Sequence, residues 1–298
     1  MIKECILYKK EKGRKVRCLA CAHKCIINEG KTGICSVRKN INGKIYLLVY
    51  GKIASLGIDP IEKKPLYHFL PGTYAFSIGT IGCNFKCDFC QNFDISQASK
   101  KKVSSKQSFE DCQIFGEEMS PNEVVNKAIK TECKSIAYTY NEPVIWIEFV
   151  KDCAVIAEKK GLKNILVTNG YFSYESFDFI KDYIDAMNID LKGNDRYYKK
   201  LCGGKLKPVL DTIKRAYKKG IHIEITTLIV PGENDDEKEL EKIAKFIAGI
   251  DKNFPWHISR FFPRYKMMKK EATPLDSLKM AEKIGKKAGL KNVHLGNA

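Results

Sequence analysis

The sequence predicts an α/β protein in which a barrel or partial barrel of parallel strands follows a small cysteine-rich module. Three observations lead to this class. From Thr73 onward, short runs of strand-forming residues alternate with amphipathic helical windows, which is the pattern of βαβ units. Six such units extend over about 220 residues, more than a small doubly wound sheet needs. Residues 1–72 are instead rich in Gly, Cys and Lys, so we expect residues 73–298 to form the core barrel.

The candidate strands are short and almost continuously apolar, as expected for parallel strands that are covered on both faces. They comprise residues 73–80, 134–140, 163–169, 184–191, 221–230 and 256–261, with residues 291–296 as a candidate seventh strand. In a sheet of this kind the chemistry lies at the carboxyl ends of the strands. Functional residues are therefore expected directly after these strands.

The helical windows between the strands carry their own start and stop signals. Ser120 precedes Pro121 as an N-cap, and Gly161 and Gly220 end two other windows. The windows are residues 120–132, 144–161, 208–220, 234–249 and 273–289. Together with the strands, they predict helices that cover the outside of the barrel.

Two further segments have clear local signals. The pair Asn42-Gly43 lies between two alternating runs in the N-terminal module and predicts a tight hairpin turn. Residues 95–118 are polar, rich in Ser and Lys, and predict a loop.

Composition limits the function classes. The chain has 298 residues, of which 44% are hydrophobic, so it is neither disordered nor fibrous. No apolar stretch is long enough for a membrane span, and the first residues lack the pattern of a secretory signal, so we expect a cytoplasmic protein without a membrane partner. The net charge is +17, but it comes mostly from dispersed lysines, which favours a solvated surface over a nucleic-acid groove. A nucleic-acid partner stays an alternative.

Twelve cysteines in such a chain are more consistent with metal ligands, buried thiols or catalysts than with disulfides. Cys83, Cys87 and Cys90 follow the first barrel strand with the spacing C-x3-C-x2-C. Three thiolates on one loop can hold three irons of a 4Fe-4S cluster and leave the fourth iron open to a small chelating molecule. Zinc is less favoured here, because no nearby His supplies a fourth ligand.

A second cysteine group lies in the N-terminal module. Cys18, Cys21, Cys25 and Cys35 have the spacing C-x2-C-x3-C-x9-C. Four thiolates suit a structural zinc ion, which would fold a module too small to hold a core. An auxiliary iron–sulfur cluster and a metal-free module are the alternatives.

The cysteine loop, with Phe89 just before its last cysteine, resembles the radical S-adenosylmethionine (SAM) superfamily, and within it the glycyl-radical-enzyme activases. Further motifs narrow the resemblance to the AmmeMemoRadiSam system radical SAM enzyme. These motifs are residues 59–72, 138–143, 167–171, 188–193, 229–235 and 257–267. The resemblance implies a partial (β/α)6 barrel of the TIM type, a 4Fe-4S cluster bound by the three loop cysteines, and SAM.

The resemblance also implies which residues contact SAM after the second strand. The segment YTYNEP stands where relatives carry a Gly-Gly-Glu element that binds the amino group of SAM. Thr139, Tyr140 and Asn141 lie where the glycines would be, and Glu142 keeps a carboxylate that can pair with an ammonium group. Phe89 belongs to the same expected cofactor site. The alternative is that this segment only begins a helix.

Later strands are expected to contribute further contacts. Asp190 and Lys192 resemble the activase pair that meets the ribose and carboxylate of SAM, and strand alternation places both side chains on one face. Thr168 and Asn169 end the third strand and are expected to contact the ribose, although Asn-Gly is also a common turn. His257 resembles a position near adenine or substrate, with a hydrogen-bonded structural histidine as the alternative.

The implied activity is reductive cleavage of SAM to methionine and a 5′-deoxyadenosyl radical, which abstracts hydrogen from an unidentified substrate. A reductant such as ferredoxin or flavodoxin would supply the electron, and Ammecr- and Memo-type proteins are candidate partners. Three alternatives remain: a glycyl-radical activase acting on a partner protein, a nucleic-acid-modifying or nucleic-acid-binding protein, and a zinc-stabilised scaffold without SAM turnover.

Overall fold

The computed structural model describes residues 1–98 and 114–297. Its main sheet has eight strands in the order β16-β15-β14-β13-β12-β11-β9-β8. The strands are β8 (Ser55–Pro60), β9 (Tyr74–Gly79), β11 (Ser135–Tyr138), β12 (Lys163–Thr168), β13 (Ala186–Asp190), β14 (His222–Ile229), β15 (Trp256–Arg260) and β16 (Val293–Gly296). All neighbouring pairs from β9 to β16 are parallel, and β8 pairs antiparallel with β9.

The sheet confirms the predicted α/β fold of partial-barrel type. The six predicted strands and the candidate seventh strand are all present, in chain order. In the described residues, β8 and β16 are the two edges and do not pair, so the barrel is open. The predictions missed β8, which falls within residues 1–72 and contributes an edge strand to the main sheet.

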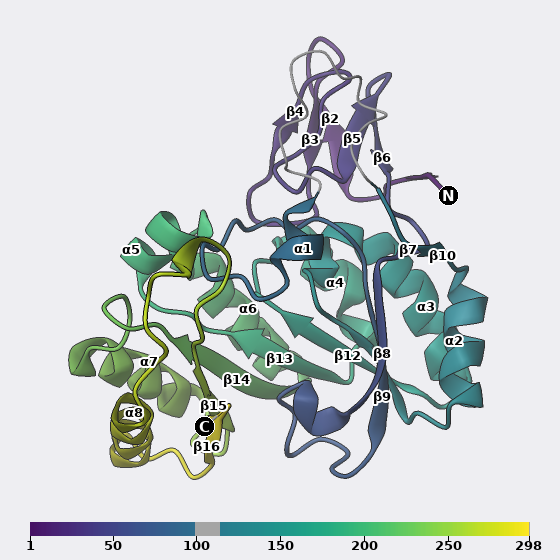
Figure 1. Ribbon diagram of the computed structural model, residues 1–298. Coiled ribbons are helices and arrows are strands. Elements are labelled where there is room, and N and C mark those ends of the chain that lie inside the picture. The colour runs from purple at the N-terminus through teal and green to yellow at the C-terminus, as the bar shows by residue number, and fades with distance from the viewer. Residues whose placement is uncertain (99–113, 298) are drawn as a thin grey trace.

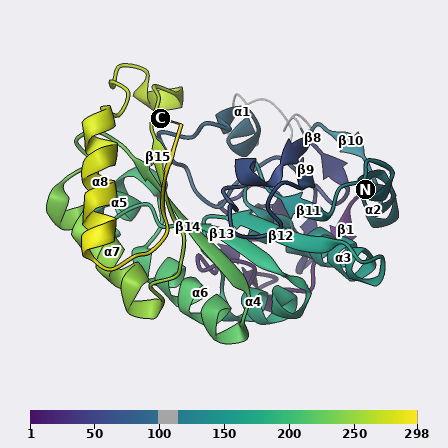
Figure 2. The ribbon, with the colours of Figure 1, turned by 90° about the horizontal axis from the view of Figure 1, so that it is seen from below.

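Helices form an arc around the outside of this sheet (Figure 2). The longer ones are α2 (Pro121–Lys130), α3 (Ile147–Lys159), α4 (Tyr174–Ile180), α6 (Leu206–Lys219), α7 (Glu237–Ile250) and α8 (Leu275–Lys287). Five match the predicted windows, and α4 was not predicted. Short turns of helix are α1 (Phe93–Ser96), α5 (Asp195–Tyr197), the 3-10 segments at Ile61–Lys63, Pro143–Trp146, Lys181–Tyr183 and Tyr265–Met267, and a π-helical turn at Tyr198–Cys202.

Helix ends form as their sequences predict. The Ser120 hydroxyl accepts a hydrogen bond from the amide of Glu123, whose carboxylate in turn accepts one from the amide of Ser120. This capping box satisfies two backbone donors that the first turn leaves unpaired. Helix α6 ends at Gly220, which has φ +79°, a conformation that is strained for a residue with an L side chain.

The N-terminal residues form small antiparallel sheets above the barrel, on the side where α1 lies (Figure 1). The strands are β1 (Lys3–Glu4), β2 (Tyr8–Lys10), β3 (Val16–Cys18), β4 (Ile26–Ile27), β5 (Arg38–Ile41), β6 (Lys44–Leu47) and β7 (Lys52–Ile53), the last pairing with β10 (Glu117–Glu118). The predicted hairpin joins β5 to β6. Asn42 and Gly43 both have positive φ, 52° and 75°, as a two-residue hairpin turn requires.

One buried ion pair ties these small sheets to the barrel. The guanidinium group of Arg38 in β5 donates bonds of 2.8 and 2.6 Å to the two carboxylate oxygens of Glu148 in α3, and both side chains are almost fully buried. The Ile6 amide also donates to Glu148. The predicted loop at residues 95–118 falls largely on residues 99–113, which lie outside the described part of the chain. Its two ends were predicted wrongly, because Ile95 and Ser96 belong to α1 and Glu117–Glu118 pairs with β7 as β10.

A small second core fills the inside of the barrel at one end. It consists of Ala75, Ala137, Ile165 and Ala186 from four neighbouring strands, packed against Ile61 and Leu66. The segment carrying Ile61 and Leu66 is fixed by Glu224 of β14, whose buried carboxylate accepts bonds from the amides of Tyr67 and His68 at 3.0 and 2.8 Å.

No helix among the described residues has the length and apolar character needed to span a membrane.

Candidate functional site

The cysteine loop begins directly after β9. Cys87 is buried, and Cys83 and Cys90 are half-buried. Cys83 Sγ accepts a bond of 3.4 Å from the Phe85 amide, and Cys90 Sγ lies 3.1 Å from the Ser96 hydroxyl. The three predicted iron ligands therefore lie at the carboxyl end of the first parallel strand.

Asparagines fix this loop to the end of β11. Asn141 accepts a bond of 3.2 Å from the Thr80 amide and donates one of 3.0 Å to the Gly82 carbonyl oxygen. Asn92 donates a bond of 2.7 Å to the carbonyl oxygen of Tyr140, a residue with φ +67°. Asn141, predicted as a SAM contact, thus holds the start of the cysteine loop.

The end of β12 binds the same loop. The Asn169 side-chain amide donates a bond of 2.8 Å to Asn84 Oδ1, and Asn169 Oδ1 accepts one of 3.0 Å from the Tyr171 amide. On the other side of the loop, His23 Nε2 lies 2.9 Å from the Asn84 carbonyl oxygen. The predictions missed Asn84 and His23. The position of Asn84 directly after the first loop cysteine was the available signal.

Glu142 joins the ends of β11 and β12. Its carboxylate accepts bonds from the Val144 amide (3.1 Å), the Thr168 hydroxyl (2.7 Å) and the Asn169 amide (2.8 Å). The side chain is almost fully buried. Burial raises the pKa of Glu142 to about 7, although these three donors act to lower it. Three predicted residues, Glu142, Thr168 and Asn169, therefore form one connected group.

Asp190 and Lys192 form an ion pair beside the cysteine loop. Lys192 Nζ lies 2.6 Å from Asp190 Oδ2 and 5.8 Å from the centre of the Phe89 ring. The Tyr198 hydroxyl accepts from the Lys192 amide and donates to the Asp190 carbonyl oxygen, each at 3.1 Å. The pKa of Lys192 is raised: burial opposes its charge, but Asp190 and the Cys87 thiol favour it.

Two predicted residues have other surroundings. Thr139 is buried, and its backbone amide donates to the Ile78 carbonyl oxygen. His257 Nε2 lies 2.6 Å from Glu224, which also contacts His222 at 3.0 Å. The side-chain hydrogen bond of His257 therefore leads to Glu224, which holds the segment that carries Ile61 and Leu66, and not to the cysteine loop.

Three buried polar atoms around the cysteine loop have no hydrogen-bond partner within the described residues. They are Thr80 Oγ1, Asn84 Nδ2 and Tyr197 Oη, and the Tyr197 ring packs 5.7 Å from that of Phe89. Buried donors without partners are rare in proteins, because each costs free energy unless a bound group completes it. Together with three thiols, which are the usual ligands of iron–sulfur clusters, they make the loop suited to a cofactor.

The N-terminal cysteines lie together near this loop. Burial raises the pKa of Cys21, Cys25 and Cys35, and all three thiols also interact electrostatically with Cys18. The backbone of Cys21 forms a bridge with Phe172, which follows β12. Across residues 1–98 and 114–297, however, no three or more His, Cys, Asp or Glu side chains are arranged to hold one metal ion. A 4Fe-4S cluster differs from a single ion in that it spans several separated thiols.

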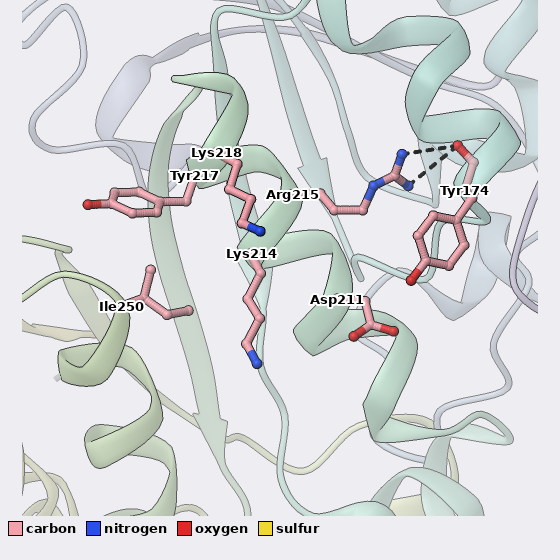
Figure 3. A pocket seen from close by; sticks show the side chains of 7 residues that line it. All are labelled: Tyr174, Asp211, Lys214, Arg215, Tyr217, Lys218 and Ile250. Carbon is pink, nitrogen blue, oxygen red and sulfur yellow. Dashed lines mark hydrogen bonds between the residues drawn. The ribbon is translucent and has the colours of Figure 1, made fainter.

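A groove along α6 lies apart from these residues (Figure 3). Its cavity of about 200 Å³ is lined by Tyr174, Asp211, Lys214, Arg215, Tyr217, Lys218 and Ile250. The Arg215 guanidinium group lies 4.5 Å from the Tyr174 ring centre and donates two bonds of 3.4 Å to the Tyr174 carbonyl oxygen. None of the predicted site residues lines this cavity, which is a basic, aromatic surface feature.

Comparisons with known proteins show the family of this chain. Residues 77–247 match the Radical SAM superfamily model. An uncharacterized protein of Methanocaldococcus jannaschii is 45% identical over 99% of this chain and 85% of its own length. A putative glycyl-radical enzyme activating enzyme of the same organism is 27% identical over 70% of this chain and 75% of its own length.

The fold has solved counterparts. The crystal structure of a radical SAM methyltransferase from Sphaerobacter thermophilus has a TM-score of 0.57 and 12% identity, covering 100% of this chain and 78% of that one. Radical SAM proteins are enzymes that use a 4Fe-4S cluster together with SAM. The family match covers more than half of the chain and includes the cysteine loop and the ends of β11, β12 and β13. The chain therefore belongs to the Radical SAM superfamily.

Proposed function

We propose that Cys83, Cys87 and Cys90 hold the 4Fe-4S cluster and that the polar residues at the ends of β11, β12 and β13 bind SAM. The observation that carries this proposal is the hydrogen-bonded chain from the cysteine loop through Asn84, Asn169 and Glu142. When bound, the cluster and SAM supply one-electron radical chemistry that ends in hydrogen abstraction from a substrate. The protein positions both groups and excludes water.

Each predicted residue has a role in this proposal. Asp190 and Lys192 pair with the ribose and carboxylate groups of SAM, and Phe89 packs beside them. Glu142 offers its negative charge to the SAM amino group, and it orients Thr168 and Asn169 through its hydrogen bonds. Thr139 and Asn141 shape the same edge. For His257, we propose a contact with adenine or substrate that Glu224 orients.

The test of these roles is SAM binding by anaerobically reconstituted protein. Replacing Asp190 or Lys192 by Ala removes a charge-assisted contact, which is typically worth about 1.5–3 kcal/mol. Lys245→Ala, which breaks an ion pair with Glu241 on the same helix α7, is the matched control. Affinities for SAM that are the same in all three variants and the unmodified protein would contradict these assignments.

We also propose that the protein acts in the AmmeMemoRadiSam system, with Ammecr- and Memo-type proteins as partners and ferredoxin or flavodoxin as reductant. The support is the motif resemblance over most of the chain. Co-purification of the anaerobic protein with Ammecr- and Memo-type proteins from the same cell tests this. A glycyl-radical activase is the second candidate, because a putative activating enzyme is 27% identical to this chain. Formation of a glycyl radical in a partner protein, detected by electron paramagnetic resonance, would distinguish the two.

For the N-terminal cysteine group we propose a structural zinc ion within a module of residues 1–72, and residues 73–298 as the catalytic barrel, to whose sheet β8 of that module adds an edge strand. The support is that the four thiols interact electrostatically in a part of the chain whose strands have only two to four residues, which cannot form a large core. To bind one zinc ion, the four sulfur atoms must lie closer to one another than they do in this structure. Metal analysis of a Cys83/Cys87/Cys90→Ala variant should find about one zinc and no iron. Iron without zinc would favour an auxiliary cluster.

The cytoplasm is the proposed location, because a reducing compartment keeps cysteine thiols available as metal ligands. Nucleic acid is the third candidate partner, and the groove along α6 is where it would bind, since cations and exposed aromatic rings meet there. RNA binding that falls with salt and is lost in Lys214→Glu/Lys218→Glu, but kept in Lys283→Glu/Lys287→Glu on α8, would support that candidate.

A further inference from the structure

A fourth cysteine, Cys202, lies beside the cysteine loop although it is remote in sequence. It ends the π-helical turn Tyr198–Cys202 and is completely buried. Its carbonyl oxygen accepts a bond of 2.9 Å from the Lys86 amide, and the Leu201 carbonyl oxygen accepts one of 3.1 Å from the Asp88 amide. These two backbone bonds flank Cys87 on both sides and hold it against Cys202.

The close approach depends on two glycines. A Cβ atom at Gly204 would lie 2.4 Å from the Phe85 ring, and one at Gly203 would lie 2.9 Å from the Lys86 side chain. Gly203 also has φ +77°. With no side chains at these positions, the turn packs directly on the loop, and the Cys202 thiol interacts with the Cys87 thiol.

With Cys202, each of the three loop sulfurs has a neighbouring group that can form a hydrogen bond with it. Cys83 Sγ accepts from the Phe85 amide, and Cys90 Sγ lies within hydrogen-bond distance of the Ser96 hydroxyl. Cys87 lies between the two backbone bonds to Leu201 and Cys202, and its thiol interacts with the Cys202 thiol. In an iron-bound state Cys87 is a thiolate and can only accept, so the thiol of Cys202 must donate.

We propose that Cys202 is a positioning residue that donates a hydrogen bond to the iron-bound sulfur of Cys87 and thereby raises the reduction potential of the cluster. This inference rests on the proposed ligand role of Cys87. Reduction adds negative charge to the cluster and its sulfurs, and a donor to a ligand sulfur stabilises that charge. The donor therefore favours the reduced state, which the reaction needs.

The experiment is a redox titration of the reconstituted cluster without SAM, followed by electron paramagnetic resonance. Cys202→Ala and Cys202→Val both remove the donor, and Val fills a similar volume, so both should shift the midpoint potential to a more negative value. Cys202→Ser keeps a donor and should stay close to the unmodified protein. Cys153→Ala, at another fully buried cysteine on α3, is the matched control and should leave the potential unchanged.

Iron analysis distinguishes a failure of the proposed ligand role of Cys87 from a failure of the proposed donor role of Cys202. Retention of cluster iron in Cys87→Ala would contradict the proposed ligand assignment itself. With iron bound in the Cys202 variants, midpoint potentials equal to that of the unmodified protein would overturn only the role of Cys202. A shift in Cys202→Ser as large as that in Cys202→Val would also overturn it, because the donor would then not be the cause. Should Cys202→Ala assemble no cluster, the Ser and Val pair gives the decision.

Discussion

The side-chain amide of Asn169 donates a hydrogen bond of 2.8 Å to the side-chain oxygen of Asn84, the residue directly after Cys83. This bond joins the end of β12 to the cysteine loop, and both side chains are buried. Because Asn169 is also held by the Glu142 carboxylate, a change at the proposed SAM site reaches the loop through two hydrogen bonds.

We expect Asn84→Ala and Asn169→Ala to loosen the cysteine loop and to speed iron release to a chelator. Because the two side chains bond each other, the double variant should lower the free-energy barrier to iron release by less than the sum of the two single variants. The coupling energy should be about 0.5–3 kcal/mol. Asn253→Ala in an exposed turn is the control. Strict additivity would show that the bond does not stabilise the loop.

The buried Arg38–Glu148 pair should dominate the attachment of the N-terminal sheets. Glu148→Ala leaves the Arg38 charge buried and unpaired, so we expect a loss of about 3–5 kcal/mol in the free energy of unfolding, measured with urea. The double variant Arg38→Met/Glu148→Leu should lose less. Lys245→Ala breaks an exposed pair and should cost under about 1 kcal/mol. A loss in Glu148→Ala no larger than that in Lys245→Ala would contradict this role.

SAM affinity should rise with pH through the pKa of Glu142, which is about 7. Below this pH the buried carboxyl is largely protonated and offers no charge to the cationic SAM, whereas above it the carboxylate attracts SAM. Binding titrations at pH 6 and pH 8 check this. Glu142→Gln should bind SAM more weakly and lose the difference between the two pH values, while Glu158→Gln, at an exposed position, should keep it. The same slope in Glu142→Gln and the unmodified protein would rule out a direct charge contribution.

Acid should release the segment at Tyr67 and His68 that Glu224 holds. Burial acts to raise the pKa of Glu224, but bonds from His222, His257 and the Tyr67 and His68 amides lower it to about 2. The group therefore contributes stability above its ordinary pKa, and this is lost as the pH falls toward 2, in total about 3 kcal/mol. Urea unfolding at pH 5 and pH 3 should show a smaller difference for Glu224→Gln than for the unmodified protein. An equal difference in both would contradict this.

Local signals were enough for most of the fold. The predicted strands are apolar runs whose burial alone fixes them, and Ser120 and Gly220 mark helix ends through their own backbone bonds. Strand β8 could not be predicted in this way, because Ser55–Pro60 contains Gly, Asp and Pro and is a strand only through its pairing with β9.

The candidate site likewise has residues that the sequence predicts and residues that only long-range contacts reveal. Cysteine spacing predicted the loop, and the resemblance to activases predicted Asp190 and Lys192, which form an ion pair beside it. Asn84, His23 and Cys202 contribute through contacts that span 61 to 116 residues of chain, and no local pattern reports such contacts. Glu224 offered a signal that the predictions missed, since a charged residue within an apolar strand needs partners, and His257 is one of them.

The most direct test of the central claim is the formation of 5′-deoxyadenosine by anaerobically reconstituted protein with SAM and a strong reductant. The unmodified protein should contain about four irons for the loop site and release 5′-deoxyadenosine and methionine. The Cys83/Cys87/Cys90→Ala variant should lose that iron and form neither product, while Cys153→Ala should behave like the unmodified protein. Undiminished iron and product formation in the triple variant would show that the cluster lies elsewhere and would contradict the account.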